Sequence, residues 1–94
     1  MREEVRDRYG NVIYLTDERW RHIVKAHPQL NSKRAVVLSV IRSGKRRRDP
    51  GLSDKYFYTK PFAFPSRFKV IEVVVFYSWQ NNQPNNFVIT AYPK

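Results

Sequence analysis

The 94-residue sequence contains no cysteine, so it can form no disulfide bond, Cys-based zinc site or thiol nucleophile. Its longest apolar run, Val73 to Tyr77, is far shorter than the ~20 residues that span a bilayer. Met1 leads directly into charged residues, which is unlike a secretory signal peptide. We therefore predict a cytoplasmic protein without a membrane partner.

Acidic residues are also few, and they are absent from one third of the sequence. The formal net charge is +10, and the segment from Arg19 to Arg48 contains ten Lys or Arg residues without one Asp or Glu. A concentrated positive charge on a small domain attracts a polyanion, most often a nucleic acid. Solubility and an acidic protein partner are the alternative explanations of this charge.

Hydrophobic residues make up 41% of the sequence, and aromatic residues make up 15%. This composition can fill one modest core, and it argues against disorder of the whole chain. We expect residues 1–94 to form a single domain.

The stretch from Thr16 to Leu30 has the signals of a helix start and a helix end. Thr16 is a suitable N-cap, and Pro28 cannot continue a helix, so the helix is predicted to end near His27. Four residues recur at the spacing i, i+3, i+4 and i+7 and share the predicted packing face of this helix: Trp20, Ile23, Val24 and His27. His22 lies roughly opposite this face.

The remaining elements follow from turn residues and apolar periodicity. Gly10-Asn11 predicts a tight turn between strands at 5–9 and 12–15. The apolar residues at 35–41 predict a second helix, with an N-cap at Asn31-Ser32 and an end at Gly44. Its predicted core residues are Val36, Val37, Val40 and Ile41. Residues 45–48 are predicted to form a basic loop. The last expected segments are a strand at 55–60, a loop at 62–66, a long strand at 67–79, a polar turn at 81–86 and a strand at 87–92.

This order predicts an α+β fold, in which two helices cover one face of an antiparallel sheet. Along the last strand, side chains alternate between the two faces of the sheet. Phe87, Ile89 and Ala91 are predicted to face the core, and Val88, Thr90 and Tyr92 are predicted to share the open face.

Several motifs together resemble a family of small nucleases. They are Tyr9-Gly10-Asn11 to Leu15, Thr16-Asp17-Glu18-Arg19-Trp20, His22-Ile23, His27-Pro28-Gln29-Leu30 and Val88-Ile89-Thr90-Ala91-Tyr92-Pro93. The chain resembles the BECR superfamily, named from barnase, EndoU, the anticodon-nuclease colicins and RelE, and within it the phage- and plasmid-borne PBECR-type domains. Where the family most often has an acidic residue after His-Pro, this sequence has Gln29.

The resemblance implies a BECR/RelE-like fold and a metal-independent endoribonuclease, often the toxin of a toxin–antitoxin or phage system. Such cleavage needs a base for the 2′-OH, an acid for the leaving oxygen, and donors that stabilise the phosphorane charge. Histidine suits both proton transfers, because its pKa lies near neutral pH. The candidate catalytic residues are His22, His27, Thr90 and Tyr92.

Each candidate also has a purely structural explanation. His27 can stabilise the helix C-terminus, His22 can simply be exposed, and Thr90 and Tyr92 can pack in a strand. Which histidine is catalytic stays open. The histidines are five residues apart, whereas metal ligands on one helix face are three or four apart, so no metal or cofactor is predicted.

Basic side chains are the predicted contacts to RNA phosphates, namely Arg19, Lys45, Arg46, Arg47, Arg48, Lys60 and Arg67. The alternative function is a non-catalytic RNA-binding module that stacks bases on Tyr56, Tyr58 and Tyr92. A third alternative is an interaction protein without RNA affinity. If the protein is a toxin, an acidic antitoxin or inhibitor is expected to cover the basic face.

Overall fold

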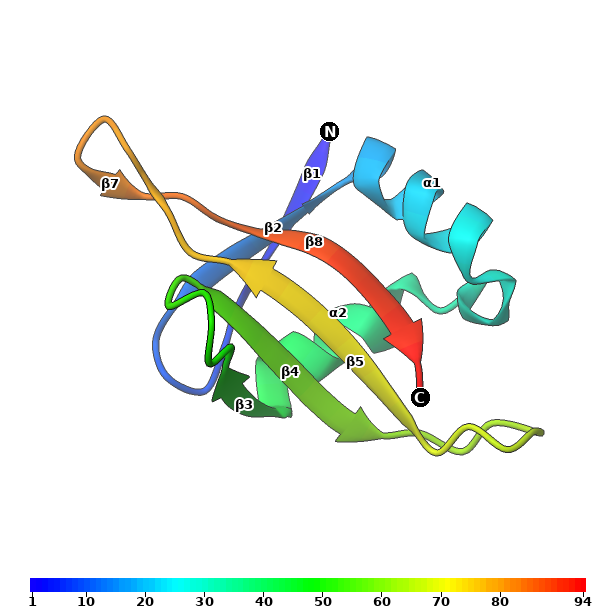
Figure 1. The fold of residues 1–94 in the computed structure, drawn as a ribbon. Helices are drawn as coiled ribbons and strands as arrows, with labels where there is room; N and C mark the ends of the chain where they lie inside the picture. Colours follow the sequence, from blue (N-terminus) through cyan, green and yellow to red (C-terminus); the bar gives the residue numbers. More distant parts are fainter.

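A computed structural model describes residues 1–94 as a six-stranded sheet with two α-helices (Figure 1). The strands are hydrogen-bonded in the order β1-β2-β8-β5-β4-β3, and β6 and β7 form a separate small hairpin. In chain order the elements are β1 (Arg2–Arg6), β2 (Val12–Thr16), α1 (Asp17–Ala26), the 3-10 helix η1 (Pro28–Leu30), α2 (Arg34–Ser43), β3 (Lys45–Arg48), β4 (Lys55–Pro61), β5 (Val70–Phe76), β6 (Trp79–Gln80), β7 (Gln83–Pro84) and β8 (Asn86–Pro93). The α+β class is confirmed.

The N-terminal hairpin is confirmed, although its first strand begins at Arg2 rather than at Val5. Gly10 has a φ of +87°, a conformation that favours glycine at this turn. The buried Asp7 carboxylate fixes the turn, since it accepts hydrogen bonds from the backbone N–H groups of Tyr9 (2.9 Å) and Asn11 (2.8 Å). The turn is thus held by a side chain as well as by its glycine.

Helix α1 begins and ends where its capping residues predict. The Thr16 hydroxyl accepts a hydrogen bond from the backbone N–H of Arg19 at 3.0 Å, and His27 is the C-cap before η1. Only Ile23 on the predicted packing face is fully buried, while Trp20 and His27 are half-buried. The shallow burial matches the position of α1 along the edge of β8, where β2 has diverged from it (Figure 1).

Helix α2 lies behind the sheet in Figure 1, against β1, β4 and β5. It extends one residue before and two residues beyond the predicted 35–41, and its N-cap is Lys33 rather than Asn31-Ser32. Its buried residues are Val37, Leu38, Val40 and Ile41. Gly44 is the C-cap, as predicted. Neither α1 nor α2 has the length and apolarity of a membrane-crossing helix.

Two predictions about the sheet are wrong. The sheet is mixed, because β2 pairs in parallel with β8 at Ile13–Asn86 and Tyr14–Phe87. The helices do not both cover one face, since α1 lies at an edge and α2 alone crosses the sheet. Strand β2 leaves β8 after two residue pairs, and α1 occupies the space that opens beside β8.

The predicted basic loop at 45–48 is also wrong, because these residues form the edge strand β3, antiparallel to β4. Paired backbone groups on the β4 edge stabilise a strand that has no apolar alternation of its own. The predicted polar turn at 81–86 contains β7 and the turn that joins it to β6, with Asn81 and Asn82 at positive φ. Strand β5 covers only Val70–Phe76 of the predicted 67–79.

Fifteen buried residues form one hydrophobic core between the sheet and the helices. A bulge in β8 changes which residues reach this core. Val74 pairs with Thr90 but Val75 pairs with Val88, so Ile89 is an extra residue between them. Val88 is therefore buried with Ala91, and its predicted place on the open face is wrong. Phe87 is only half-buried and contacts Phe76 instead of the core.

Candidate functional site

A buried glutamate occupies the sheet face opposite the core. Glu72 is the only charged residue of β5, and its side chain is 3% exposed. Its Oε1 accepts a hydrogen bond from the Tyr92 hydroxyl at 2.6 Å. Its Oε2 accepts hydrogen bonds from the Thr59 hydroxyl at 3.0 Å and from Arg47 Nη2 at 3.1 Å. A carboxylate this deeply buried needs such partners.

The strand register assembles this group. Thr59, Glu72 and Tyr92 are direct neighbours across β4, β5 and β8, so their side chains share one face. Arg47 reaches the same face from β3, with its guanidinium 4.3 Å from the ring centre of Phe57. Lys94 follows β8, and its Nζ lies 3.8 Å from Glu72 Oε1. We call Arg47, Thr59, Glu72, Tyr92 and Lys94 the Glu72 cluster.

The electrostatics of the Glu72 cluster keep the carboxyl group ionised. Burial alone would raise the pKa of Glu72, but the hydrogen bonds from Tyr92 and Thr59 and the charges of Arg47 and Lys94 lower it on balance. Burial and the hydrogen bond to Glu72 raise the pKa of Tyr92 to about 12. At neutral pH the cluster therefore has an anion that accepts protons and a phenol that donates a hydrogen bond.

Of the four predicted catalytic residues, three lie together at this end of the sheet. The His27 ring centre is 5.9 Å from that of Tyr92. Thr90 lies two pairs further along β8, on the same face as Tyr92. His22 is exposed on α1, away from the packing side of the helix. The structure thus places His27, and not His22, beside the Glu72 cluster.

The predicted RNA-binding residues of β3 point in two directions. Lys45 and Arg47 stand on the open face, and the Arg47 side chain is 54% exposed. Arg46 points to the opposite face, where its guanidinium lies 4.1 Å from the ring centre of Tyr9 and 4.6 Å from that of Tyr56. Arg48 is on that side as well.

Arg46 belongs to a second polar group, which ties β3 to the N-terminal hairpin. Its Nη1 donates a hydrogen bond to the Tyr77 hydroxyl at 3.1 Å and lies 4.0 Å from Asp7 Oδ2. The same Asp7 oxygen accepts hydrogen bonds from the hydroxyls of Tyr58 and Tyr77. Burial would raise the pKa of Asp7, but the hydrogen bonds from Tyr58, Asn11 and Tyr9 lower it on balance. We call Asp7, Arg46, Tyr58 and Tyr77 the Asp7 cluster.

The other predicted RNA contacts are dispersed. Lys60 Nζ donates a hydrogen bond to the Ser43 hydroxyl at 2.8 Å, on the α2 side. Arg67 is exposed in the loop between β4 and β5, with its guanidinium 5.3 Å from the ring centre of Phe68. Arg19 is exposed on α1 and lines a shallow hollow of about 180 Å³. Of these three residues, none contacts the Glu72 cluster.

The sequence reasoning missed Glu72, Thr59 and Lys94. One signal for Glu72 was present, because a single carboxylate inside a run of valines is costly unless it has buried partners. Thr59 and Lys94 have no such signal, since only the register brings them to Glu72. The stacking role considered for Tyr58 is wrong, because Tyr58 is fully buried in the core.

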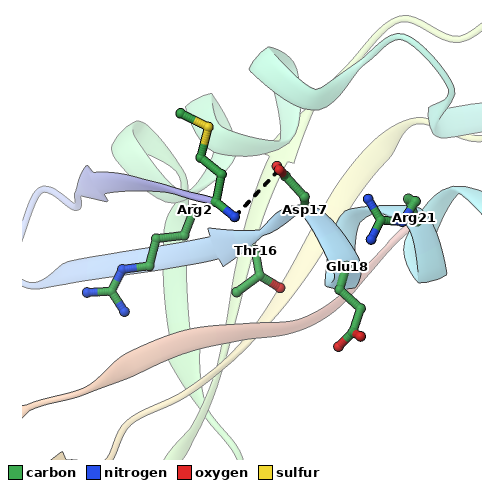
Figure 2. Close-up of a pocket in the computed structure, with 6 residues that line it drawn as sticks. Arg2, Thr16, Asp17, Glu18 and Arg21 are labelled. Atoms are coloured by element: carbon green, nitrogen blue, oxygen red, sulfur yellow. Dashed lines mark ion pairs between the residues drawn. The ribbon is translucent and has the colours of Figure 1, made fainter.

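A separate hollow of about 510 Å³ lies at the start of α1, and Figure 2 shows its lining residues. The Met1 amino group lies 3.8 Å from Asp17, and Arg34 lies 2.9 Å from the same carboxylate. The hollow thus has acidic and basic side chains close together, and its charges are largely paired. We assign it no function.

No group of three or more His, Asp or Glu residues is arranged to hold a metal ion. Comparisons of the chain with protein-family models, curated proteins and solved structures gave no match.

Proposed function

We propose that the protein is an endoribonuclease that cleaves RNA without a metal ion, by attack of the ribose 2′-OH on the adjacent phosphate. One observation supports this proposal above the others. An ionised, buried Glu72 lies on an open sheet face between two cationic side chains, and the ring centre of its partner Tyr92 is 5.9 Å from that of the half-buried His27. This arrangement supplies an acceptor, a donor and positive charge, which are the three requirements of the reaction.

In the proposed mechanism, Glu72 accepts the proton of the 2′-OH as the bond from O2′ to phosphorus forms. Protonated His27 donates its proton to O5′ as the bond from phosphorus to O5′ breaks. The products are a 2′,3′-cyclic phosphate and a 5′-hydroxyl end. Either residue can exchange its proton with water afterwards, which returns the site to its starting state.

The cations of the Glu72 cluster have a second task in this mechanism. The side chains of Arg47 and Lys94 are 54% and 60% exposed, so both can turn toward a bound phosphate. Their departure from Glu72 removes the charges that lower its pKa, and Glu72 becomes a stronger base as the substrate binds. Thr59 and Tyr92 keep the carboxylate in position by hydrogen bonds.

The order of a hairpin, two helices and antiparallel strands supports membership of the BECR superfamily as a further part of this proposal. We extend the proposal to a toxin role in the cytoplasm, with an acidic inhibitor protein that covers Arg47 and Lys45. Arg47→Gln should then weaken the affinities for RNA and for the inhibitor together, and both should fall as salt rises.

Incubation of the purified protein with total RNA in excess EDTA tests the reaction. We expect cleavage that leaves cyclic phosphate ends, detected by mass spectrometry of the fragments. Glu72→Gln and His27→Asn should each lower kcat by roughly 10²- to 10⁴-fold, while the matched control His22→Asn should not. Cleavage that requires a divalent metal ion would refute the mechanism. RNA binding without cleavage would favour the binding module instead.

A further inference from the structure

A third hollow lies at the end of the sheet away from the Glu72 cluster. It has a volume of about 600 Å³ and lies among the turn after β1, the segment between β3 and β4, and the β6–β7 hairpin. The residues that matter for its chemistry are Arg48, Asp54, Tyr56 and Trp79. None of them belongs to the Glu72 cluster or to the Asp7 cluster.

Trp79 is the most unusual residue of this hollow, because 74% of its surface is exposed. It lies on a short hairpin in which Trp79 pairs with Pro84. The backbone N–H of Asn85 donates a hydrogen bond to the carbonyl oxygen of Ser78 at 2.7 Å, which closes the hairpin at its base. The indole ring is therefore exposed to solvent on a hydrogen-bonded hairpin, and a flat ligand can stack on it without any change in the core.

Arg48 is already oriented at the edge of the hollow. Its Nε and Nη2 donate hydrogen bonds to the Tyr56 hydroxyl at 3.0 and 2.7 Å. The Tyr56 ring in turn packs against Tyr77, with 4.5 Å between the ring centres. An arginine fixed in this way loses less conformational entropy when it binds a phosphate.

Asp54 adds a carboxylate to a hollow that also contains Arg48. Its backbone carbonyl accepts a hydrogen bond from the backbone N–H of Tyr77 at 2.8 Å, so the segment before β4 is held against the end of β5. A carboxylate repels phosphate but accepts hydrogen bonds from the amino groups of a nucleobase. The hollow therefore offers a ring to stack on, an acceptor for a base edge, and one arginine for an adjoining phosphate.

We propose that this hollow binds an unpaired nucleobase of single-stranded RNA, which stacks on Trp79 while Arg48 holds the neighbouring phosphate. The inference depends on the proposed function in that it places the base on the same RNA strand that is cleaved at Glu72. Phe76 lines the hollow and lies four residues from Glu72 on β5, a distance of about 13 Å at ~3.3 Å per residue. This distance equals about four stacked nucleotides at roughly 3.4 Å each. Arg48 and Tyr56 point to the face of the sheet opposite Glu72, so an RNA strand that reaches both sites passes around the end of β5 and needs at least this length. Paired bases are stacked on one another and cannot occupy the site.

The first experiment measures binding separately from cleavage. In a Trp20→Phe protein, Trp79 is the only tryptophan. A 2′-deoxy octanucleotide, which lacks the attacking hydroxyl, should quench its fluorescence, and a duplex of the same sequence should not. Trp79→Ala should weaken octanucleotide binding, measured by anisotropy, by roughly 5- to 150-fold. Arg48→Gln should weaken it more than the matched control Arg42→Gln, whose arginine is exposed on α2.

The second experiment compares RNA substrates of different length. Trp79→Ala should lower kcat/KM for an octanucleotide far more than for a dinucleotide, because a dinucleotide at Glu72 is too short to reach the hollow. Thermal unfolding of each variant shows whether the protein is still folded. An equal loss on both substrates in a folded variant, or unchanged Trp79 fluorescence at saturating octanucleotide, would overturn the proposal.

The two proposals can fail independently. If no RNA is cleaved but the octanucleotide quenches Trp79, the nuclease assignment is wrong and the base-binding site is supported. If RNA is cleaved at Glu72 and Trp79 does not respond, the nuclease assignment is supported and the base-binding site is wrong. If an acidic protein rather than RNA binds at Trp79, the octanucleotide will not compete with it, and the proposal also fails.

Discussion

Glu72→Gln and Asp7→Asn form a matched pair of substitutions, because both residues are buried carboxylates whose pKa values are lowered by hydrogen bonds. They lie on opposite faces of the sheet, and only Glu72 faces the proposed RNA site. We expect Glu72→Gln to abolish most RNA cleavage with a small loss of stability. We expect Asp7→Asn to do the reverse.

The contacts of each carboxylate set the expected size of these effects. Asp7 Oδ1 accepts two backbone N–H groups, and the side chain is 0% exposed. In Asp7→Asn, the new NH₂ group replaces Oδ2, which accepts hydrogen bonds from the Asn11 amide and the Tyr77 hydroxyl, so donor faces donor. The substitution also removes the carboxylate nearest to Arg46. With hydrogen bonds to charged groups contributing ~1.5–3 kcal/mol each, Asp7→Asn should lower the free energy of unfolding by about 3 kcal/mol.

Glu72 has more adaptable partners. The hydroxyl groups of Tyr92 and Thr59 can rotate and accept hydrogen bonds from an amide, and the exposed side chains of Arg47 and Lys94 can turn to water. Glu72→Gln should therefore cost only about 1 kcal/mol. Removal of a general base should lower kcat by roughly 10²- to 10⁴-fold.

Urea denaturation measures the change in the free energy of unfolding, as a shift of the midpoint at constant slope, and cleavage of a short RNA measures the change in kcat.

The folded-state pKa values of Asp7 and Glu72 lie below their ordinary values of 3.8 and 4.5. Their stabilisation is thus present above about pH 4.5 and is lost as the pH falls through the folded pKa values. Asp7→Asn should remove part of this acid-induced loss. Full activity in Glu72→Gln, or loss of activity without loss of stability in Asp7→Asn, would refute the assignment.

Three further predictions concern single positions. Gly44→Ala should lower the free energy of unfolding by more than 2 kcal/mol or prevent folding, since a Cβ there would lie 2.4 Å from the carbonyl oxygen of Val40; circular dichroism checks this. Thr16→Ala should cost about 1 kcal/mol through loss of the α1 cap and lower the melting temperature by roughly 4–8 °C, as calorimetry can measure. In a Glu72-intact protein, His27→Asn should lower kcat for RNA cleavage by roughly 10²- to 10⁴-fold while His22→Asn leaves it unchanged; equal kcat values for the two variants would contradict the choice of His27.

Local chemistry in the sequence determined the N-terminal hairpin and both helices. Gly10 at the turn, Thr16 before α1, Pro28 after it and Gly44 after α2 act within a few residues of their own positions, so their effects are visible without the rest of the chain. For the same reason the apolar spacing of α2 identified three of its four buried residues, and only Leu38 was missed.

The tertiary structure alone decided the sheet and most of the site. Residues 45–48 form a strand because the edge of β4 is available to them, and no pattern within four basic residues encodes that neighbour. One extra residue at Ile89 moves Val88 into the core, and strict alternation cannot anticipate a bulge. Thr59, Glu72 and Tyr92 meet because three strands pair in one register, and this long-range pairing is set by burial of the opposite face rather than by any residue near Glu72 itself.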